Sequence, residues 1–114
     1  MIPLSDLRLG NIFLHGGKIE KIVDYISFTN TYHYEPIKLT PEILEQIATK
    51  FNGFDIAYFN DNFTIRHIGE FGWHTIDSLG RMDKHVEYLH DLQNIYYYEN
   101  NKQELPININ TLKI

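Results

Sequence analysis

Six histidines are the first residues in this sequence that suggest chemistry, because imidazole is a common metal ligand and proton carrier. His85 and His90 are five positions apart, so on a helix they would point about 140° away from each other and would not share an ion. His67 and His74 lie on neighbouring predicted strands with Glu70 between them, but ordinary strand histidines show the same pattern. The sequence has no cysteine and no His-Glu-x-x-His motif, the usual zinc patterns. We therefore expect no metal site and no cofactor.

Nucleophilic or carboxylate catalysis has no support in the sequence. The serines lack the Gly-x-Ser-x-Gly setting of a nucleophile elbow. Carboxylate pairs such as Glu42 with Glu45, and Glu87 with Asp91, have the spacing of a solvated helix face, where charges usually lie. We predict no catalytic residue and no enzymatic activity.

Consecutive tyrosines at Tyr96-Tyr97-Tyr98 are the strongest sign of a binding surface. Consecutive helical residues differ in direction by about 100°, so the rings cannot all point inward. If Tyr96 is buried, Tyr98 is exposed and Tyr97 lies at the edge. Exposed tyrosines are enriched in interface hot spots because they bury a large area at low conformational cost. The alternative is that they only cover the seam between helix and sheet, with their hydroxyls in water.

Protein binding is therefore the primary functional prediction. The predicted partner-binding residues are Tyr97, Tyr98, Glu87, Asp91, Tyr32 and Tyr34. The alternative is a small module that stacks single-stranded RNA or DNA on aromatic residues of predicted strands. Its candidate residues are Tyr58, Phe59, Phe63, Phe71 and Trp73. The formal net charge of −5 opposes non-specific binding to phosphates, and core packing explains most of these aromatics better.

The element that should organise the fold is a long helix predicted over residues 82–100. Its apolar residues recur at helical spacing, with Glu87 and Asp91 on the opposite side. The residues of the apolar face are Met82, Val86, Tyr88, Leu89, Leu92, Ile95 and Tyr96. Asp83 is a candidate cap for its start, and Asn100-Asn101 suits its end because Asn tolerates a left-handed conformation.

A shorter helix is predicted over residues 40–51, where Thr40 is the N-cap and Pro41 takes the first helical position. Residues 11–26 read as a β-hairpin with Gly16-Gly17 at its turn. Residues 54–59, 63–68 and 73–76 read as a three-strand meander. We expect an α+β fold: an antiparallel sheet of about five strands in two hairpin groups, with the long helix packed on it. Residues 105–114 would add an edge strand or form a mobile tail.

Composition limits the class of protein. The hydrophobic fraction of 43% and the aromatic fraction of 14% are typical of a folded globule, and the length fits a single domain over residues 1–114. The sequence shows no basic leader and no apolar run near the roughly 18 residues of a membrane span. We expect a soluble cytoplasmic protein with no membrane partner.

Three stretches carry a resemblance to a known family. They are Leu7-Arg8-Leu9-Gly10-Asn11, Pro36–Leu44, and His85–Tyr97 with its His, Leu-Gln-Asn and aromatic pattern. They resemble a family of small phage- and prophage-associated proteins of Bacteroidetes. Where that family usually has a glycine after the helix, this sequence has Asn100-Asn101.

The resemblance implies a phage-associated α+β domain and carries over no catalytic residue. Some small phage proteins of this class inhibit host defences, including CRISPR effector nucleases. By analogy at the level of the class, it implies a stoichiometric, anti-CRISPR-type inhibitor that binds a host protein or protein–RNA complex.

Overall fold

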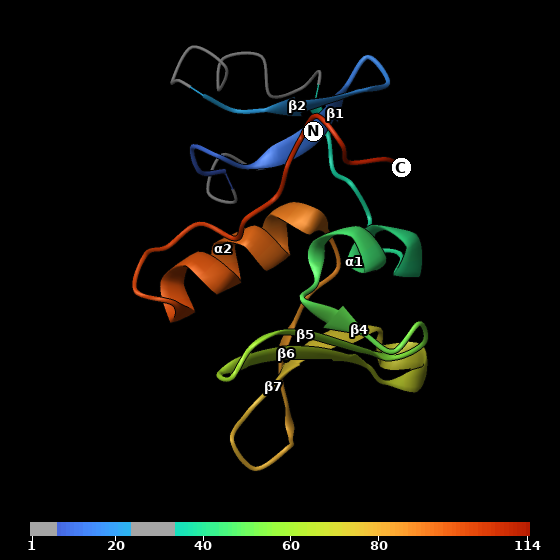
Figure 1. Cartoon of the computed structure of the whole chain (residues 1–114), viewed down its shortest axis with the longest axis vertical. Helices are drawn as coiled ribbons and strands as arrows, with labels where there is room; N and C mark the ends of the chain where they lie inside the picture. The colour runs from blue at the N-terminus through green and yellow to red at the C-terminus, as the bar shows by residue number, and fades with distance from the viewer. Residues whose placement is uncertain (1–6, 24–33) are drawn as a thin grey trace. The chain divides into compact units, whose positions relative to one another are not determined.

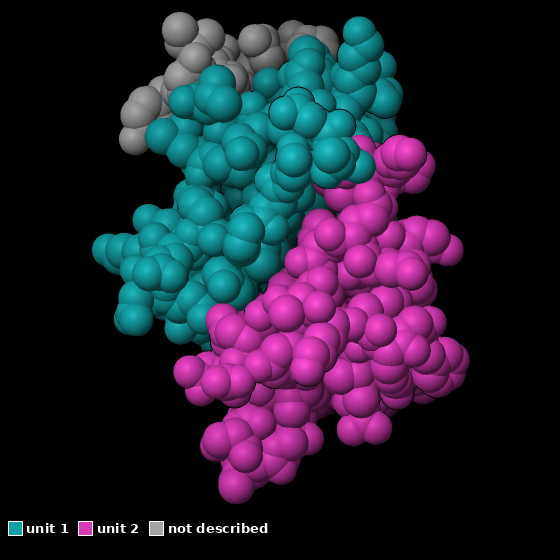
Figure 2. Space-filling view, viewed as in Figure 1, with its two compact units in different colours: residues 1–38, 88–111 teal, residues 39–87, 112–114 magenta. Residues whose placement is uncertain are grey.

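The structure is a computed structural model that describes residues 7–23 and 34–114, in which the chain divides into two compact units. Unit 1 comprises residues 1–38 and 88–111, and unit 2 comprises residues 39–87 and 112–114 (Figure 2). The predicted α+β fold with a five-stranded antiparallel sheet is confirmed, but the two predicted hairpin groups lie in two separate sheets, one of three strands and one of five. The division into units does not test the prediction of a single domain over residues 1–114.

Unit 1 contains a three-stranded antiparallel sheet in the order β2-β1-β3 (Figure 1). Its strands are β1 (Ile12–His15), β2 (Lys18–Lys21) and β3 (Tyr34–Glu35). The predicted first hairpin is confirmed, because β1 and β2 pair across a turn formed by Gly16 and Gly17, with φ angles of 58° and 82°. Both angles are left-handed, which glycine adopts without a steric penalty. The predicted hairpin continued to Ile26, of which residues 24–26 lie outside the described ranges.

The second element of unit 1 is α2 (Leu89–Glu99), which is shorter than predicted. Residues 82–85 do not begin this helix but form a strand, and the prediction that Asp83 caps the helix is wrong. The helix begins instead after Tyr88, whose backbone N–H donates to the Asp91 carboxylate at 3.0 Å. It ends as expected at asparagines: Asn100 is the C-cap, and Asn101 has a left-handed φ of 56°.

Unit 2 contains the five-stranded sheet in the order β4-β5-β6-β7-β8, antiparallel throughout. Its strands are β4 (Lys50–Phe51), β5 (Ile56–Asn60), β6 (Phe63–His67), β7 (Trp73–Ile76) and β8 (Met82–His85), with a short 3-10 helix η3 (Gly69–Phe71) before β7. The predicted meander corresponds to β5, β6 and β7. Strands β4 and β8 are additions, because the segments predicted as helix ends pair with the sheet instead.

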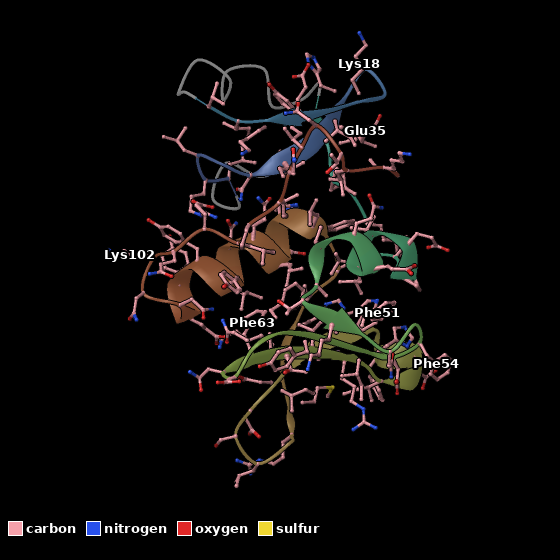
Figure 3. All side chains as sticks on the ribbon, in the orientation of Figure 1. Lys18, Glu35, Phe51, Phe54, Phe63 and Lys102 are labelled. Carbon is pink, nitrogen blue, oxygen red and sulfur yellow. The ribbon has the colours of Figure 1, made fainter. Side chains whose placement is uncertain are left out.

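The two faces of this sheet differ in burial. Ala57, Ile65 and Thr75 pair across β5, β6 and β7 and are buried, and Phe51 and Phe63 lie on the same packed side (Figure 3). The helix of unit 2 lies over this packed side (Figure 1). Residues of alternate register project from the other side, which we call the open face. Exposed or half-exposed side chains of the open face are Lys50, Ile56, Tyr58, Thr64, Arg66, Ile76, Met82 and His85.

The helix of unit 2 is α1 (Pro41–Ile47), so the prediction of a helix to Phe51 is wrong at its C-terminal end. Its start is as predicted, since the Thr40 hydroxyl accepts the backbone N–H of Ile43 at 3.2 Å and Pro41 occupies the first turn. Ala48 is already extended at ψ 148°, which turns the chain into β4. The described part of the chain contains no helix that is long and apolar enough to cross a membrane.

Residues 105–114 form no strand in the structure, and two of their side chains, Leu105 and Leu112, are buried. Lys113 is held by Gln46 of α1, because its backbone N–H donates to the Gln46 amide oxygen and its carbonyl accepts the Gln46 amide N–H, each at 2.7 Å. The end of the chain is thus tied to unit 2 by a reciprocal pair of hydrogen bonds.

Candidate functional site

A network of polar side chains fixes the C-terminal half of α2 within unit 1. Arg8 is its centre: the guanidinium donates to the Asn94 side chain at 3.0 Å and forms an ion pair with Glu104. Asn11, which is fully buried, accepts the backbone N–H of Arg8 at 2.7 Å and donates to the Asn94 oxygen at 2.8 Å. Because its donors and acceptors are used within the chain, this network is better suited to holding a surface than to reacting with a substrate.

Gln93 joins α2 to the start of β1. Its side chain is 2% exposed, and its amide oxygen accepts the backbone N–H of Ile12 at 2.8 Å while its amide nitrogen donates to the Gly10 carbonyl at 2.9 Å. A buried backbone group without a partner costs free energy, so the amide supplies the bonds that a neighbouring strand would otherwise give. The start of β1 and the middle of α2 are therefore locked together.

Tyr97 and Tyr98 lie on the last turns of α2, and we call them the tyrosine pair. The Arg8 guanidinium carbon lies 4.0 Å from the centre of the Tyr97 ring, a cation–π contact that holds this half-buried ring in place. The two tyrosine rings meet edge to face with their centres 5.3 Å apart. Tyr98 is 68% exposed. Tyr98 is outside and Tyr97 is at the edge, as predicted, whereas Tyr96 is half-buried rather than buried.

The chain leaves the tyrosine pair through a tight turn. Asn101 and Lys102 have left-handed φ angles of 56° and 60°, and the backbone N–H of Lys102 donates to the Tyr97 carbonyl at 2.8 Å. Glu104 then returns to the Arg8 guanidinium. The surface around the tyrosine pair therefore combines two rings with exposed charges of both signs, Lys102, Glu99 and Glu104.

The other predicted partner-binding residues that the structure describes have different settings. Tyr34 is 8% exposed on β3, where its ring packs against Phe13 and offers little area to a partner. Asp91 caps α2 as described above, and Glu87 is exposed but belongs to unit 2. Tyr32 lies outside the described residues.

The aromatic residues of the nucleic-acid alternative are likewise divided. Phe59, Phe63 and Trp73 are buried, so their faces cannot stack on bases. Tyr58 is half-buried on the open face, and Phe71 is exposed on η3.

Comparisons with protein-family models, with curated proteins and with solved structures found no match.

The histidines are arranged differently from the sequence expectation. The register pairs Arg66 with His74 and His67 with Trp73, so His67 and His74 project from opposite faces of the sheet. His85 lies on β8 rather than on a helix, and its ring centre is 4.9 Å from that of His74. Within the two described ranges no group of three or more His, Asp or Glu side chains is arranged to hold a metal ion.

A hollow in unit 1 and a hollow in unit 2 each have the volume of a small-ligand site. The one in unit 1, with a volume of about 460 Å³, is lined mainly by apolar side chains, and the carboxylate at its rim, Glu104, is already paired with Arg8. The one in unit 2, about 390 Å³, contains Asp61 and Asp77. Asp61 accepts the Tyr58 hydroxyl, and Asp77 accepts two backbone N–H groups of its own turn. Neither hollow brings an unengaged acid and base together.

Sequence reasoning missed the network that supports the tyrosine pair. One signal was present: Gln93 follows Leu89 by four residues, which places an amide on the buried side of the helix. A buried amide requires partners, so it indicates a polar connection rather than ordinary core packing. Its partners are backbone atoms, and no pattern of residue types reveals those.

Proposed function

We infer that the chain acts by binding a protein partner, without a cofactor and without catalytic turnover, and that the tyrosine pair is the centre of the contact. The observation that carries this inference is the exposure of Tyr98 on a rigid support. Tyr98 is 68% exposed, and an aromatic ring that is largely in water gains free energy when a partner buries it.

Pre-organisation strengthens the proposal. Tyr98 contacts Tyr97, and Tyr97 is held by Arg8, which is itself fixed by Asn94 and Glu104. A ring that is already held loses less conformational entropy on binding than a free one, so more of its buried area contributes to affinity.

The most concrete partner comes from the resemblance of the sequence to small phage-associated proteins. On this proposal the protein is a phage or prophage accessory factor in the cytoplasm of its bacterial host. It inhibits a host defence nuclease, a protein or protein–RNA complex of the CRISPR effector class, by stoichiometric binding.

The test has a binding part and an inhibition part. The chain is used to recover a nuclease complex from a host lysate, and cleavage by that complex is then measured at increasing ratios of the chain. We expect inhibition to saturate at a fixed small ratio. Tyr98→Ala should weaken binding by about 2 kcal/mol, roughly thirtyfold in Kd, as for an interface hot spot. Phe54→Ala is the matched control, since it removes an exposed aromatic ring from unit 2.

The proposal fails if Tyr97→Ala and Tyr98→Ala both bind and inhibit as tightly as the unmodified chain. It also fails if one molecule of the chain processes many equivalents of any substrate.

A further inference from the structure

The turn between β4 and β5 contains Asn52-Gly53, the only asparagine in the sequence that is followed by glycine. The backbone nitrogen of the residue after an asparagine can attack the side-chain amide, and glycine hinders this attack least because it has no side chain. Asn52 and Gly53 are both exposed, and a Cβ added to Gly53 would meet nothing within 4 Å. The pair therefore has the space and the access to water that a reaction requires.

The Asn52 side chain holds this turn together. Its amide oxygen accepts the backbone N–H groups of Phe54, Asp55 and Ile56 at 2.8, 2.9 and 3.1 Å. Its amide nitrogen donates to the Asp55 carboxylate at 2.7 Å. The turn lies between Phe51 and the start of β5, and it carries the exposed Phe54 ring (Figure 3). Both ends of a single amide are thus bonded within residues 52–56.

The reaction open to this pair is an intramolecular acyl transfer. The Gly53 nitrogen gives its proton to water and forms a bond to Cγ of Asn52. The Cγ–Nδ2 bond breaks, and the nitrogen leaves as ammonia after taking a proton from water. The product is a five-membered succinimide ring, and a water molecule then opens one of the two C–N bonds within the ring. The net change consumes one water, releases one ammonia and leaves an aspartate or an isoaspartate at position 52.

The closed turn opposes this reaction. Ring closure requires the Asn52 side chain to turn its carbonyl carbon toward the Gly53 nitrogen, which breaks the bonds that hold the amide. The three N–H donors bind the oxygen of the planar amide, so they stabilise the reactant rather than the tetrahedral intermediate. The Asp55 carboxylate accepts a hydrogen bond from the nitrogen that must leave, whereas departure of that nitrogen requires a proton donor.

We propose that Asn52-Gly53 is a self-modification site that the fold protects, and that opening of the turn over residues 52–56 allows the reaction. The change does not reverse, because the ammonia is lost to water. A carboxylate at position 52 has no N–H to donate to Asp55 and places a second negative charge beside it, so the original turn does not form again. Each reaction therefore leaves a lasting chemical record in unit 2 that the turn has opened.

The experiment follows the intact chain over time at neutral pH, in buffer and in guanidinium chloride. Mass spectrometry of its peptides measures, at each asparagine, how much amide has become carboxylate. We expect Asn52 to react first, and about tenfold or more slowly in the folded chain than in denaturant, because opening must precede the reaction. This comparison uses the unmodified chain and does not depend on the folding of any variant.

A pair of variants tests the role of the hydrogen bonds. Asp55→Ala removes the acceptor of the amide nitrogen, so Asn52 in the folded chain should react about fivefold faster, while its rate in denaturant should not change. The control is Asp83→Ala, which removes an exposed carboxylate from β8 at the other edge of the sheet and should leave both rates unchanged. Circular dichroism checks that both variants remain folded. Asn52→Asp, which reproduces one product, should lower the melting temperature.

Several outcomes overturn the proposal. They are equal rates at Asn52 in buffer and in denaturant, absence of reaction at Asn52 in both, equal rates at the other asparagines, and equal rates in Asp55→Ala and Asp83→Ala. The proposal uses unit 2 and does not depend on the tyrosine pair of unit 1. Tyr98→Ala should react at the rate of the unmodified chain, so the failure of either proposal is distinguishable from failure of the other.

Discussion

At the scale of single residues, two glutamines bond backbone groups that no neighbouring strand pairs. Gln93 bonds the backbone of Gly10 and Ile12 in unit 1, and Gln46 bonds both backbone groups of Lys113 in unit 2. A primary amide has one acceptor and two donors, so it can reproduce the paired N–H and C=O bonds of an antiparallel ladder.

Replacing Gln93 should therefore destabilise unit 1 strongly. Gln93→Leu fills a similar volume but leaves the Ile12 N–H and the Gly10 carbonyl without the partner they have in the structure. We expect a loss of about 2 to 4 kcal/mol in the free energy of unfolding, measured by urea denaturation. Gln103→Leu, an exposed position, should change it by less than about 0.5 kcal/mol. Equal effects of the two variants would contradict the role given to Gln93.

The hydroxyl of Tyr58 should titrate later than an ordinary tyrosine. Its hydrogen bond to Asp61, together with burial and the Asp61 charge, raises the pKa of Tyr58 above 10.0. The hydrogen bond stabilises the fold at pH values below the pKa that Tyr58 has in the unfolded chain. This contribution is lost as the pH rises through the pKa that Tyr58 has in the folded chain. Asp61→Ala should lower the pKa of Tyr58 toward 10.0 in an ultraviolet difference titration against Tyr58→Phe. An unchanged titration curve would contradict the prediction.

The pKa of Asp77 is shifted in the opposite direction, so its contribution to stability changes at acid pH. Hydrogen bonds from the backbone of Arg81 and Leu79, and from the Arg81 side chain, lower the pKa of Asp77 below 3.8. The carboxylate therefore stabilises the β7–β8 turn at pH values above the pKa that Asp77 has in the unfolded chain. This stabilisation is lost as the pH falls through the pKa that Asp77 has in the folded chain. Thermal melts should show Asp77→Ala less stable than the unmodified chain at pH 7, with the difference shrinking below about pH 4. A difference independent of pH would contradict the role of the charge.

At the scale of elements, the β1–β2 turn is a place where the cost of backbone strain can be measured without a steric clash from the added side chain. An added Cβ would meet nothing within 4 Å at either Gly16 or Gly17, yet both have left-handed φ angles. Gly17→Ala should cost about 1 kcal/mol in unfolding free energy from backbone strain alone, while Gly16→Asn should cost less, because Asn-Gly suits this turn. Similar effects of the two variants would contradict a strain origin.

Local sequence signals predicted some element boundaries well. Thr40-Pro41 marks the start of α1 and Gly16-Gly17 marks the first turn, because each acts through its own backbone geometry. The start of α2 was predicted too early, since Met82 and Val86 fit a helical spacing by coincidence. In the structure Met82 pairs with Ile76 on β7, a long-range contact that periodicity does not encode.

For the candidate site too, the sequence predicted the features that depend on local geometry and missed those that depend on tertiary structure. The exposure of Tyr98 follows from helical geometry within a few residues. The burial of Tyr34 depends on pairing with β1, and the assignment of Glu87 and Asp91 to different compact units depends on where one unit ends and the other begins. These are properties of tertiary structure, so the residue types alone could not decide them.

At the scale of the whole molecule, the end of the chain should matter for unit 2. Leu112 is buried, and Lys113 is bonded twice to Gln46. Leu112→Ala should lower the free energy of unfolding by about 2 kcal/mol, measured by thermal or urea denaturation. Ile114→Ala, at a side chain that is 64% exposed, is the control and should have little effect. An equal loss in both variants would mean that the tail contributes no specific packing.

Residues 39–87 leave and rejoin the rest of the chain at adjacent points. The backbone N–H of Leu39 donates to the Glu87 carbonyl at 3.0 Å, and Lys38 forms a β-bridge with Tyr88. A segment whose ends already meet can be excised and its stumps joined by a short linker, or it can be transplanted into another scaffold. Residues 39–87 therefore form an insertion between residues that already meet, and residues 112–114 are the part of the flanking chain that belongs to the same unit.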